Sequence, residues 1–188
     1  ICLNSVDLEL FFEHYKVENV TYYSGWKFKA TKGLFDGFID KWSDIKIQAK
    51  INQNWGLYTI AKYMLNSLWG KFGTDIKFKS RIPYIDKENK VAYSDSQPKA
   101  KDPVYLPLAS FITSYAREEV IRPSQKIMDN YNNGISKAKW IYSDTDSLHV
   151  LLNGESVEEF LNNCGLDIDE TRLGAWKLEG KFTKAKYI

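Results

Sequence analysis

Two aspartates, Asp144 and Asp146, interrupt an otherwise apolar, strand-forming run, WIYSDTDSLHV, at residues 140–150. Apolar and β-branched residues on both sides of the aspartates predict two short strands joined by a turn near residues 144–147. Side chains at positions i and i+2 of a strand share one face, so the two carboxylates can converge on one point. Any fold of this chain must therefore accommodate two neighbouring negative charges, which repel each other when they are unpaired.

Two interpretations of this turn are open. Turns rich in Asp, Thr and Ser are common, and such a turn needs no ligand. Alternatively, a divalent cation relieves the repulsion, and Mg²⁺ favours carboxylate oxygens supplemented by water and substrate phosphates. A lone Asp-x-Asp is a weak motif, so the choice depends on the rest of the chain.

The segment GLYTIAKYMLNSLWGKF, residues 56–72, predicts a helix from about residue 57 to residue 72, because its apolar residues recur at helical spacing. One arc of this helix is apolar and should face a core: Leu57, Ile60, Ala61, Met64, Leu65 and Leu68. A second stripe points away from that arc: Tyr58, Lys62, Asn66 and Trp69.

This second stripe also has two interpretations. An amphipathic helix with a solvated outer face explains it without any ligand. However, an ammonium suits a phosphate, aromatic rings suit a base or a sugar, and Gly70 at the end of the stripe lets a backbone approach closely.

The carboxylate turn and the lysine-bearing helix together are what a two-metal phosphoryl or nucleotidyl transfer site needs. Two metal ions would activate the attacking oxygen and neutralise the leaving pyrophosphate. A lysine would stabilise charge on the phosphates. The combination favours the functional interpretation of both features.

The remaining segments predict an α+β fold without internal repeats. Helices are expected at residues 5–16, 33 to about 50, 109 to about 131 and 155–163. Strands are expected as a pair around Ser24-Gly25 within residues 19–30, as a hairpin across residues 81–95, and near residues 174–188. A Pro-punctuated loop is expected at residues 97–107, and Asn132-Asn133-Gly134 should end the long helix.

Bulk properties exclude few functions. The net charge is only +2, so a nucleic-acid partner requires locally arranged lysines. Two cysteines are too few for a disulfide framework or a zinc site, which fits a reduced, cytoplasmic setting. No apolar run approaches the roughly 20 residues of a membrane span, and no signal peptide is visible. The chain begins with Ile and ends without a tail, which indicates a piece of a longer protein.

The two central segments resemble motifs of a known family. KYMLNSLWGKFG resembles motif B of the family B DNA polymerases, Lys-x-x-x-Asn-Ser-x-Tyr-Gly, and YSDTDS resembles their motif C, Tyr-x-Asp-Thr-Asp-Ser. Their order and spacing fit, and the insert between them, with DPVY before the next helix, is similar to the protein-primed branch of phages and linear plasmids. Because VDLELFFEHY, GLFDGFIDKW and FITSYAR look similar too, the resemblance covers nearly the whole chain.

The resemblance implies a role for each candidate residue. Asp144 and Asp146 would be catalytic palm carboxylates that bind Mg²⁺ or Mn²⁺, with Asp146 preferred as the direct ligand. Lys62 would contact the phosphates of the incoming nucleotide, and Asn66 and Trp69 would line the pocket for its sugar and base. The other expected contacts are to the nucleotide, from Lys46, Lys50 and Tyr58, and to template DNA, from Ser67, Gly70 and Lys71.

The resemblance also implies subdomains and partners. The expected parts are a palm-proximal segment (1–32), a helical-hairpin fingers subdomain (33–72), a β-hairpin insertion that helps to encircle DNA (73–104), and part of the palm sheet with packed helices (105–188). The partners would be a DNA primer–template, dNTPs and a terminal priming protein, with no membrane. The setting would be the cytoplasm of a bacterial host if the chain is phage-encoded.

Three family features do not occur in this sequence. Motif A, which supplies the other metal-binding aspartate, is absent, as is the Lys-x-Tyr motif after the palm. Exonuclease carboxylate motifs are absent too. The isolated chain is therefore expected to bind Mg²⁺ weakly at best and not to polymerise DNA.

Two rival functions also fit part of the sequence. A metal-dependent glycosyltransferase would use Asp-x-Asp to hold Mn²⁺ under a sugar nucleotide, but it leaves Lys62, Asn66 and Trp69 unexplained, and no Rossmann-like βαβ run is visible. A non-catalytic DNA-binding module could keep the motif as structure. DNA binding with and without Mg²⁺, and in an Asp146→Asn variant, separates the second rival from a metal-dependent site.

Trp69 replaces the tyrosine that the family usually carries at the sugar-facing position. The larger indole is expected to exclude a 2′-hydroxyl by steric contact, although it lacks the phenol hydroxyl. Trp69→Ala should therefore lose preference for deoxynucleotides over ribonucleotides in a kinetic comparison of the two substrates. Unchanged preference in this variant would refute the role.

Overall fold

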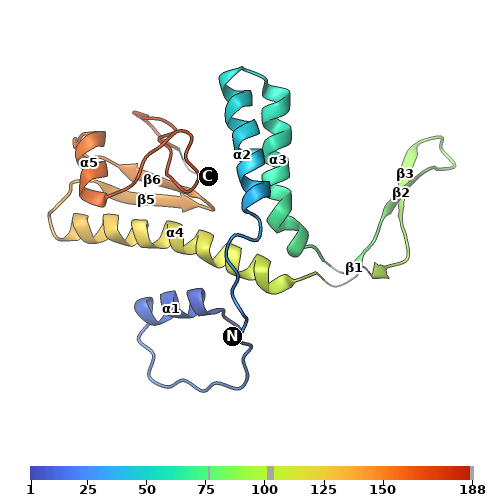
Figure 1. Ribbon diagram of the computed structural model, residues 1–188, viewed down its shortest axis with the longest axis horizontal. Coiled ribbons are helices and arrows are strands. Elements are labelled where there is room, and N and C mark those ends of the chain that lie inside the picture. Colours follow the sequence, from blue (N-terminus) through green and yellow to red (C-terminus); the bar gives the residue numbers. More distant parts are fainter. Residues whose placement is uncertain (76, 101–103, 187–188) are drawn as a thin grey trace.

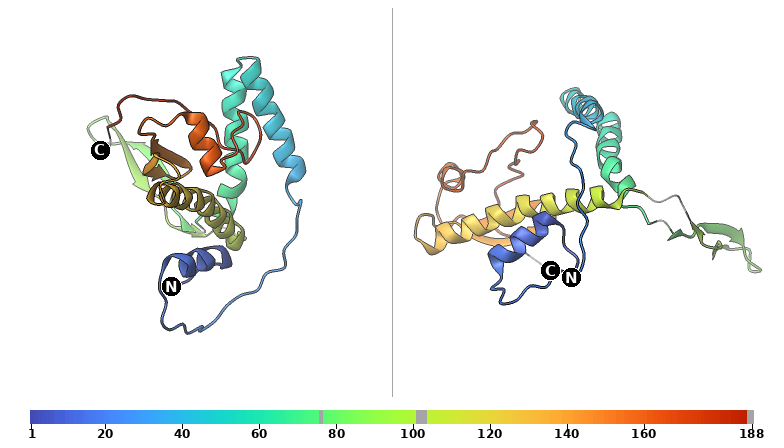
Figure 2. Two further views of the ribbon diagram at one scale, coloured as in Figure 1. Left: turned by 90° about the vertical axis from the view of Figure 1, so that its left-hand side faces the viewer. Right: turned by 60° about the horizontal axis from the view of Figure 1, so that its bottom comes forward.

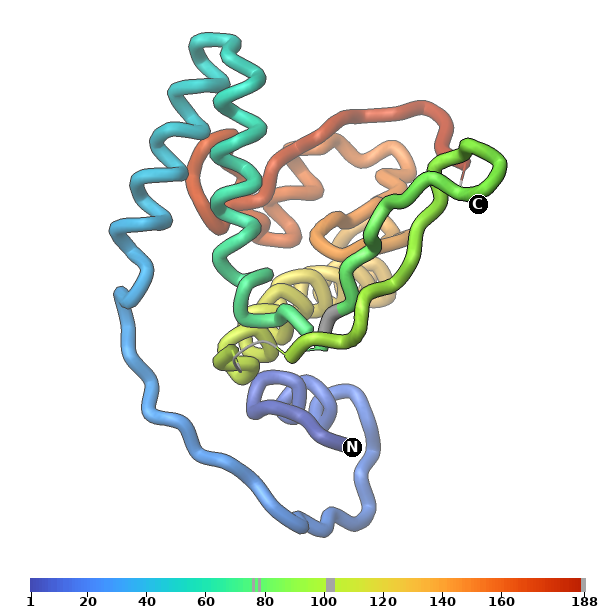
Figure 3. Tube along the Cα trace, turned by 90° about the vertical axis from the view of Figure 1, so that its right-hand side faces the viewer, coloured from blue at the N-terminus to red at the C-terminus, as the bar shows by residue number. Residues whose placement is uncertain are grey.

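The long helix α4, Leu106–Asn132, lies at the centre of the fold, and the other helices and the β5–β6 hairpin are arranged around it (Figures 1 and 2). The structure is a computed structural model that describes residues 1–75, 77–100 and 104–186. Its helix α1, Ser5–His14, lies on one side of α4, whereas the other packed elements lie on the opposite side (Figure 3). Pro107 lies in the first turn of α4, where its missing N–H breaks no helical hydrogen bond.

Helices α2, Asp36–Ile51, and α3, Trp55–Phe72, form an antiparallel hairpin that rises from α4 (Figure 1). The chain reverses at Gln53, whose φ of 55° is left-handed. The side chain of Asn54 then caps α3 by accepting a hydrogen bond from the backbone N–H of Leu57 at 3.1 Å. At the base of the hairpin the rings of Phe35 and Phe72 pack 5.8 Å apart.

A narrow β-ribbon follows α3 and projects away from the rest of the fold (Figure 1). Its inner pair joins β1, Lys77–Phe78, to β4, Lys99–Ala100, and its outer pair joins β2, Arg81–Ile85, to β3, Val91–Asp95. The outer turn is organised by Asp86, whose Oδ1 accepts hydrogen bonds from the backbone N–H groups of Glu88 and Lys90.

The main core lies where a second hairpin and a short helix pack on α4. The strands are β5, Lys139–Asp144, and β6, Ser147–Leu151, and the helix is α5, Val157–Cys164. Buried residues of all three regions meet there: Ile127, Ala138, Phe160 and Cys164. Helix α5 has a capping box between Ser156 and Glu159 and ends at Gly165, whose φ is 65°.

The carboxylate of Glu155 ties this core together. Its Oε2 accepts hydrogen bonds from Ser136 Oγ at 2.6 Å and from the backbone N–H groups of Lys137 and Ala138 at 2.7 and 3.0 Å. Its Oε1 accepts a hydrogen bond from Asn163 Nδ2 at 2.8 Å. These donors, led by the Ser136 hydroxyl, lower the pKa of Glu155. One carboxylate thus joins the start of β5 to α5.

Most predicted elements are confirmed, and the fold is α+β as expected. The helices at 5–16, 33–50, 57–72, 109–131 and 155–163 form with shifts of a few residues at their ends, and the hairpin across 81–95 forms as expected. Gly134 adopts a left-handed φ of 70° after α4, as expected. The predicted loop at 97–107 instead contains β4 and the start of α4, and its residues 101–103 lie outside the described residues.

Two strand predictions are wrong. Residues 19–30 form no strand, although their alternating side chains fit one. Tyr23 and Trp26 are almost fully exposed there, and Phe28 instead packs edge-on against Tyr105 and Phe111. Strands were also expected near residues 174–188, of which the structure describes residues 174–186. In this described part, Trp176 forms a single β-bridge with Ile168, and no strand is present. Residues 187–188 lie outside the described residues.

Two further features of the described residues are the apolar character of the helices and the state of the cysteines. None of the helices within residues 1–75, 77–100 and 104–186 has both the length and the apolar character that crossing a membrane requires. Cys2 and Cys164 are free thiols, and burial raises the pKa of Cys164.

Glu155→Gln is predicted to lower the free energy of unfolding by about 1–2 kcal/mol at neutral pH, because the donors lose a charged acceptor. The folded-state pKa of Glu155 lies below its ordinary value of 4.5. Its contribution is therefore present above pH 4.5 and is lost as the pH falls through the lowered pKa. Denaturant unfolding of both proteins across this pH range measures the difference.

The matched control is Glu158→Gln, which changes an exposed carboxyl in the first turn of α5, three residues after Glu155. This control should stay close to the unmodified protein at every pH. Equal unfolding curves for the Glu155→Gln variant and the control would contradict the role of Glu155.

Candidate active site

The Asp144–Asp146 turn closes the β5–β6 hairpin at an exposed position. Asp144 is the last residue of β5 and pairs with Ser147, the first residue of β6. Thr145 and Asp146 form the turn between them, and both aspartates are exposed. The predicted hairpin with its turn at residues 144–147 is confirmed. Asp146 lies in the turn itself, so strand alternation does not fix the direction of its side chain.

Local hydrogen bonds hold this turn tightly. The backbone N–H of Asp146 donates to the carbonyl oxygen of Asp144 at 2.6 Å, and Ser147 Oγ donates to the same oxygen at 3.0 Å. Thr145 Oγ1 donates to Asp144 Oδ1 at 3.0 Å. Thr145 also has a φ of 50°, which is unfavourable for a β-branched residue. The turn therefore stores backbone strain beside both carboxylates.

The polar stripe of α3 is also available to solvent. Lys62, Asn66 and Trp69 are exposed, whereas Tyr58 is half-buried with its ring edge-on to Trp55 at 5.9 Å. Lys62, Asn66 and Trp69 therefore share one exposed face of α3, as their spacing of three or four residues predicted.

Ser67, Gly70 and Lys71 lie beside the stripe towards the C-terminal end of α3. Ser67 is exposed, and its hydroxyl donates to the backbone carbonyl of Met64 at 2.9 Å. A Cβ at Gly70 would meet no atom within 4 Å, so open space faces this glycine. Lys71 is exposed.

The apolar arc of α3 is only partly covered, which corrects the prediction for its first turn. Ala61 is fully buried, and Met64, Leu65 and Leu68 are half-buried. Leu57 and Ile60 retain exposed fractions of 39% and 54%. They lie at the far end of the α2–α3 hairpin, away from α4 (Figure 1).

The two predicted lysines of α2 have different surroundings. Lys50 Nζ donates a hydrogen bond to Glu170 Oε2 at 2.9 Å, and this ion pair raises the pKa of Lys50. Tyr58 lies close enough to Lys50 to interact with it electrostatically. Lys46 is half-buried on the same helix. Sequence reasoning missed Glu170, since it lies 120 residues from Lys50 and no local pattern connects them.

The two motif-bearing elements, α3 and the β5–β6 hairpin, stand on the same side of α4 (Figure 1). Within residues 1–75, 77–100 and 104–186, no group of three or more His, Cys, Asp or Glu side chains could hold a metal ion. The carboxylate pair alone is a partial donor set, which suits a Mg²⁺ ion that completes its shell with water and phosphate oxygens.

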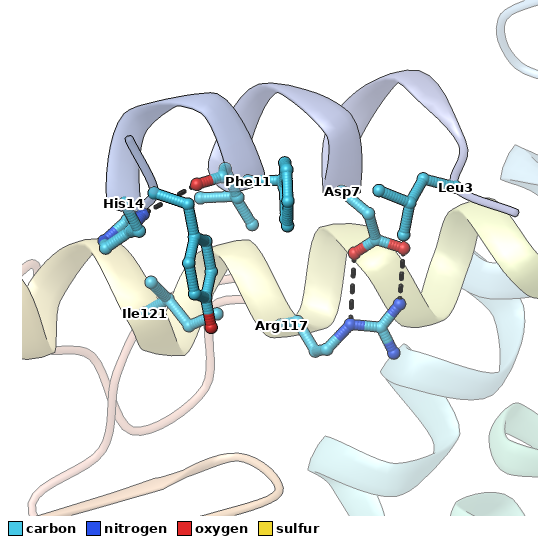
Figure 4. Close-up of a pocket in the computed structure, with 8 residues that line it drawn as sticks. Leu3, Asp7, Phe11, His14, Arg117 and Ile121 are labelled. Atoms are coloured by element: carbon cyan, nitrogen blue, oxygen red, sulfur yellow. Dashed lines mark hydrogen bonds and ion pairs between the residues drawn. The ribbon is translucent and has the colours of Figure 1, made fainter. Parts of the chain in front are cut away.

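A pocket of about 480 Å³ lies elsewhere, between α1 and α4 (Figure 4). It is lined mainly by apolar side chains, including Leu3, Phe11 and Ile121, and it contains none of the predicted site residues. At its edge Arg117 donates to both carboxylate oxygens of Asp7, at 3.1 and 2.7 Å. The Arg117 guanidinium lowers the pKa of Asp7, and the two hydrogen bonds join α1 to α4.

Comparison with known proteins identifies the class of protein. A family model described as DNA polymerase type B, organellar and viral, matches residues 3–156. The chain therefore belongs to this family, as its two motifs indicated.

The chain is similar to DNA polymerases of several bacteriophages. Over 186 residues it is 39% identical to the enzyme of Bacillus phage phi29, 38% identical to that of Bacillus phage Nf and 34% identical to that of Streptococcus phage Cp-1. Each alignment covers 99% of this chain but only 29% of the relative. The chain thus spans less than a third of the length of these relatives.

Solved structures agree in fold. The phi29 DNA polymerase complexed with primer-template DNA and incoming nucleotide substrates has a TM-score of 0.72 and 39% identity, over 91% of this chain and 27% of that one. The post-translocation binary complex with primer-template DNA has a TM-score of 0.68 and 39% identity, over 92% of this chain and 27% of that one.

Thr145→Asn is predicted to raise the free energy of unfolding by about 0.5–1 kcal/mol, because asparagine tolerates the left-handed backbone that Thr145 adopts. Denaturant titration measures the change. Thr31→Asn serves as the control, since Thr31 is exposed and has no left-handed φ. Equal stability changes in the two variants would show that the turn is unstrained.

Proposed function

We propose that this chain forms the fingers and part of the palm of a DNA-directed DNA polymerase, which extends a primer by template-directed nucleotidyl transfer. The observation that supports this most directly is the arrangement of the two motifs. An exposed carboxylate turn and an exposed Lys–Asn–Trp stripe stand on one side of α4, in a chain whose residues 3–156 match the family.

The proposed roles follow from side-chain chemistry. Lys62 binds the phosphates of the incoming nucleotide by charge, and Asn66 and Trp69 border its sugar and base. Tyr58, Lys46 and Lys50 supplement these nucleotide contacts. Ser67, Gly70 and Lys71 face the template strand, where the open space beside Gly70 admits a DNA backbone.

Asp144 and Asp146 are the proposed carboxylate ligands of Mg²⁺ or Mn²⁺, with Asp146 the direct one. A bound divalent ion would supply charge neutralisation at the reacting phosphate and activation of the primer hydroxyl. The exposed turn presents both carboxylates to solvent, which fits a site completed by substrate oxygens. A further carboxylate from outside residues 1–188 is required, because motif A does not occur in this sequence.

The subdomain assignment is part of the proposal. Residues 33–72 act as fingers, residues 73–104 as an insertion beside DNA, and residues 105–188 as palm, with residues 1–32 next to the palm. The solved relative binds primer-template DNA and incoming nucleotides, and we assign the same partners to this chain. A terminal priming protein and the cytoplasm of a bacterial host complete the proposal.

The two rival functions are less well supported. The three paired sheets described between residues 77 and 151 are antiparallel, whereas a sugar-nucleotide fold is built on parallel βαβ units. A non-catalytic DNA-binding role does not explain why two exposed carboxylates lie in a strained turn. The experiment below separates both rivals from the polymerase.

The experiment uses the polypeptide in which this chain naturally occurs. Asp146→Asn is predicted to reduce kcat for primer extension by about a thousandfold, with primer–template affinity retained. Lys62→Ala is predicted to lower kcat/KM for the nucleotide by about a hundredfold, since a charged phosphate contact is lost. Single-turnover extension and DNA-binding titrations measure the two effects.

Asp40→Asn and Lys16→Ala are matched controls, because both side chains are exposed and lie outside the proposed site. Both controls should extend primers normally, and the isolated 188-residue chain should not extend them. Full activity of the Asp146→Asn variant, or robust extension by the isolated chain, would refute the proposal.

A further inference from the structure

The β5 strand contains a β-bulge two residues before the aspartate turn. Trp140 pairs with Val150, but the next partnered residues are Tyr142 and His149, so Ile141 has no partner of its own. An extra residue in one strand shifts the alternation of side chains by one position. The bulge therefore changes the face on which every later residue of β5 lies.

Burial along β5 and the residue before it shows this shift directly. Ala138, which directly precedes β5, is buried and Trp140 is half-buried against the core, as strict alternation requires. After the bulge the order reverses, since Tyr142 is exposed and Ser143 is half-buried. Without the extra residue, Tyr142 and Asp144 would share the core-facing side with Trp140. The bulge is what places Asp144 on the open face.

A chain of hydrogen bonds spans the bulge and ends on α4. Trp140 Nε1 donates to Ser143 Oγ at 2.7 Å, and Ser143 Oγ lies 3.4 Å from Ser124 Oγ. Ser124 Oγ donates to the backbone carbonyl of Val120 at 2.7 Å, so its own proton is engaged. The proton between the two serines therefore belongs to Ser143. All three donors point in one direction, from the indole through Ser143 and Ser124 to the α4 backbone.

We propose that the Trp140–Ser143 hydrogen bond locks the bulge and so positions Asp144 for catalysis, with Trp140 and Ser143 acting as positioning residues. This inference rests on the proposed polymerase function for its catalytic consequence. Trp140 and Ser143 share the core-facing side only because of the bulge, and their bond holds that arrangement. Ser143 directly precedes Asp144, so the anchor on α4 lies one residue from the carboxylate.

The contact has the properties that such a lock needs. Trp140 packs against the core, which fixes the indole, and bulges near active sites commonly redirect a side chain. On the opposite face, the ring centroids of Tyr142 and His149 lie 5.5 Å apart. This contact favours the same assignment of faces, with Tyr142 on the open side and Ser143 on the core side. Two faces of one hairpin therefore specify the direction of Asp144.

The test uses three variants of the complete polypeptide: Trp140→Phe, Ser143→Ala and the double variant. Trp140→Phe keeps an aromatic ring in the core but removes the indole N–H together with part of the ring volume. Ser143→Ala removes the acceptor and leaves that ring unchanged, so the pair of single variants separates the hydrogen bond from packing. Each single variant is expected to lower kcat for primer extension about fivefold, as for one neutral hydrogen bond, and to raise the Mg²⁺ concentration for half-maximal rate by a similar factor. Ser143→Ala loses both the bond from Trp140 and the contact with Ser124, so the double variant should match Ser143→Ala and show no further loss from Trp140→Phe.

KM for the nucleotide should stay within about twofold in these variants, since the Lys62 stripe is untouched. Trp26→Phe and Ser5→Ala are controls, because both side chains are exposed and remote from the hairpin. Additive losses, a change in KM alone, or an unchanged kcat would overturn the inference.

A second measurement does not depend on activity. Hydrogen exchange of the Trp140 indole N–H, followed by NMR, should be slow in the unmodified protein and at least about fivefold faster in the Ser143→Ala variant. Equal exchange would overturn the lock itself. If the unmodified polypeptide extends no primer, the proposed function fails, and the exchange rates alone then decide whether the bond locks the bulge.

Discussion

Packing on α4 is the constraint on which the other features depend. Ile127 is almost completely buried where α4 meets the β5–β6 hairpin and α5. This contact sets the position of the β5–β6 hairpin along the axis of α4. On the other side of α4, Ser114 is fully buried and donates to the Asp7 carboxylate at 2.6 Å. The same helix thus orients the aspartate turn through apolar contacts and α1 through a charged one. Displacing α4 would move both.

The proposed site residues lie on two hairpins that are held on α4 by different contacts. The β5–β6 hairpin is tied to α4 by the core and by the Ser143–Ser124 contact, and at its start by the carboxylate of Glu155. The α2–α3 hairpin contacts α4 only near its base, and its far end leaves Leu57 and Ile60 in solvent. Near its tip the same hairpin is joined to the C-terminal segment by the Lys50–Glu170 ion pair, which is exposed to solvent.

Local patterns in the sequence predicted much of this structure. The helix at 57–72, the hairpin across 81–95 and the turn at 144–147 each depend on spacing or turn chemistry within a few residues, which sequence displays directly. The strand pair at 19–30 was predicted by the same reasoning and does not form, because alternation shows which side chains share a face but not whether two backbones pair. Simple alternation also places Trp140 and Asp144 on one face, and only tertiary packing reveals the bulge that separates them. Long-range pairs such as Lys50–Glu170 leave no local pattern.

The Lys50–Glu170 ion pair determines how strongly the Lys50 ammonium is held at the surface of the α2–α3 hairpin. Lys50 and Glu170 keep 40% and 60% of their side-chain surface in solvent, so water and dissolved ions already weaken their attraction. Exchange of Glu170 for a phosphate group would leave the charge of Lys50 neutralised throughout, and little desolvation would be needed. The pair is therefore a weak one, and the Lys50 ammonium can exchange Glu170 for another anion at little cost in free energy.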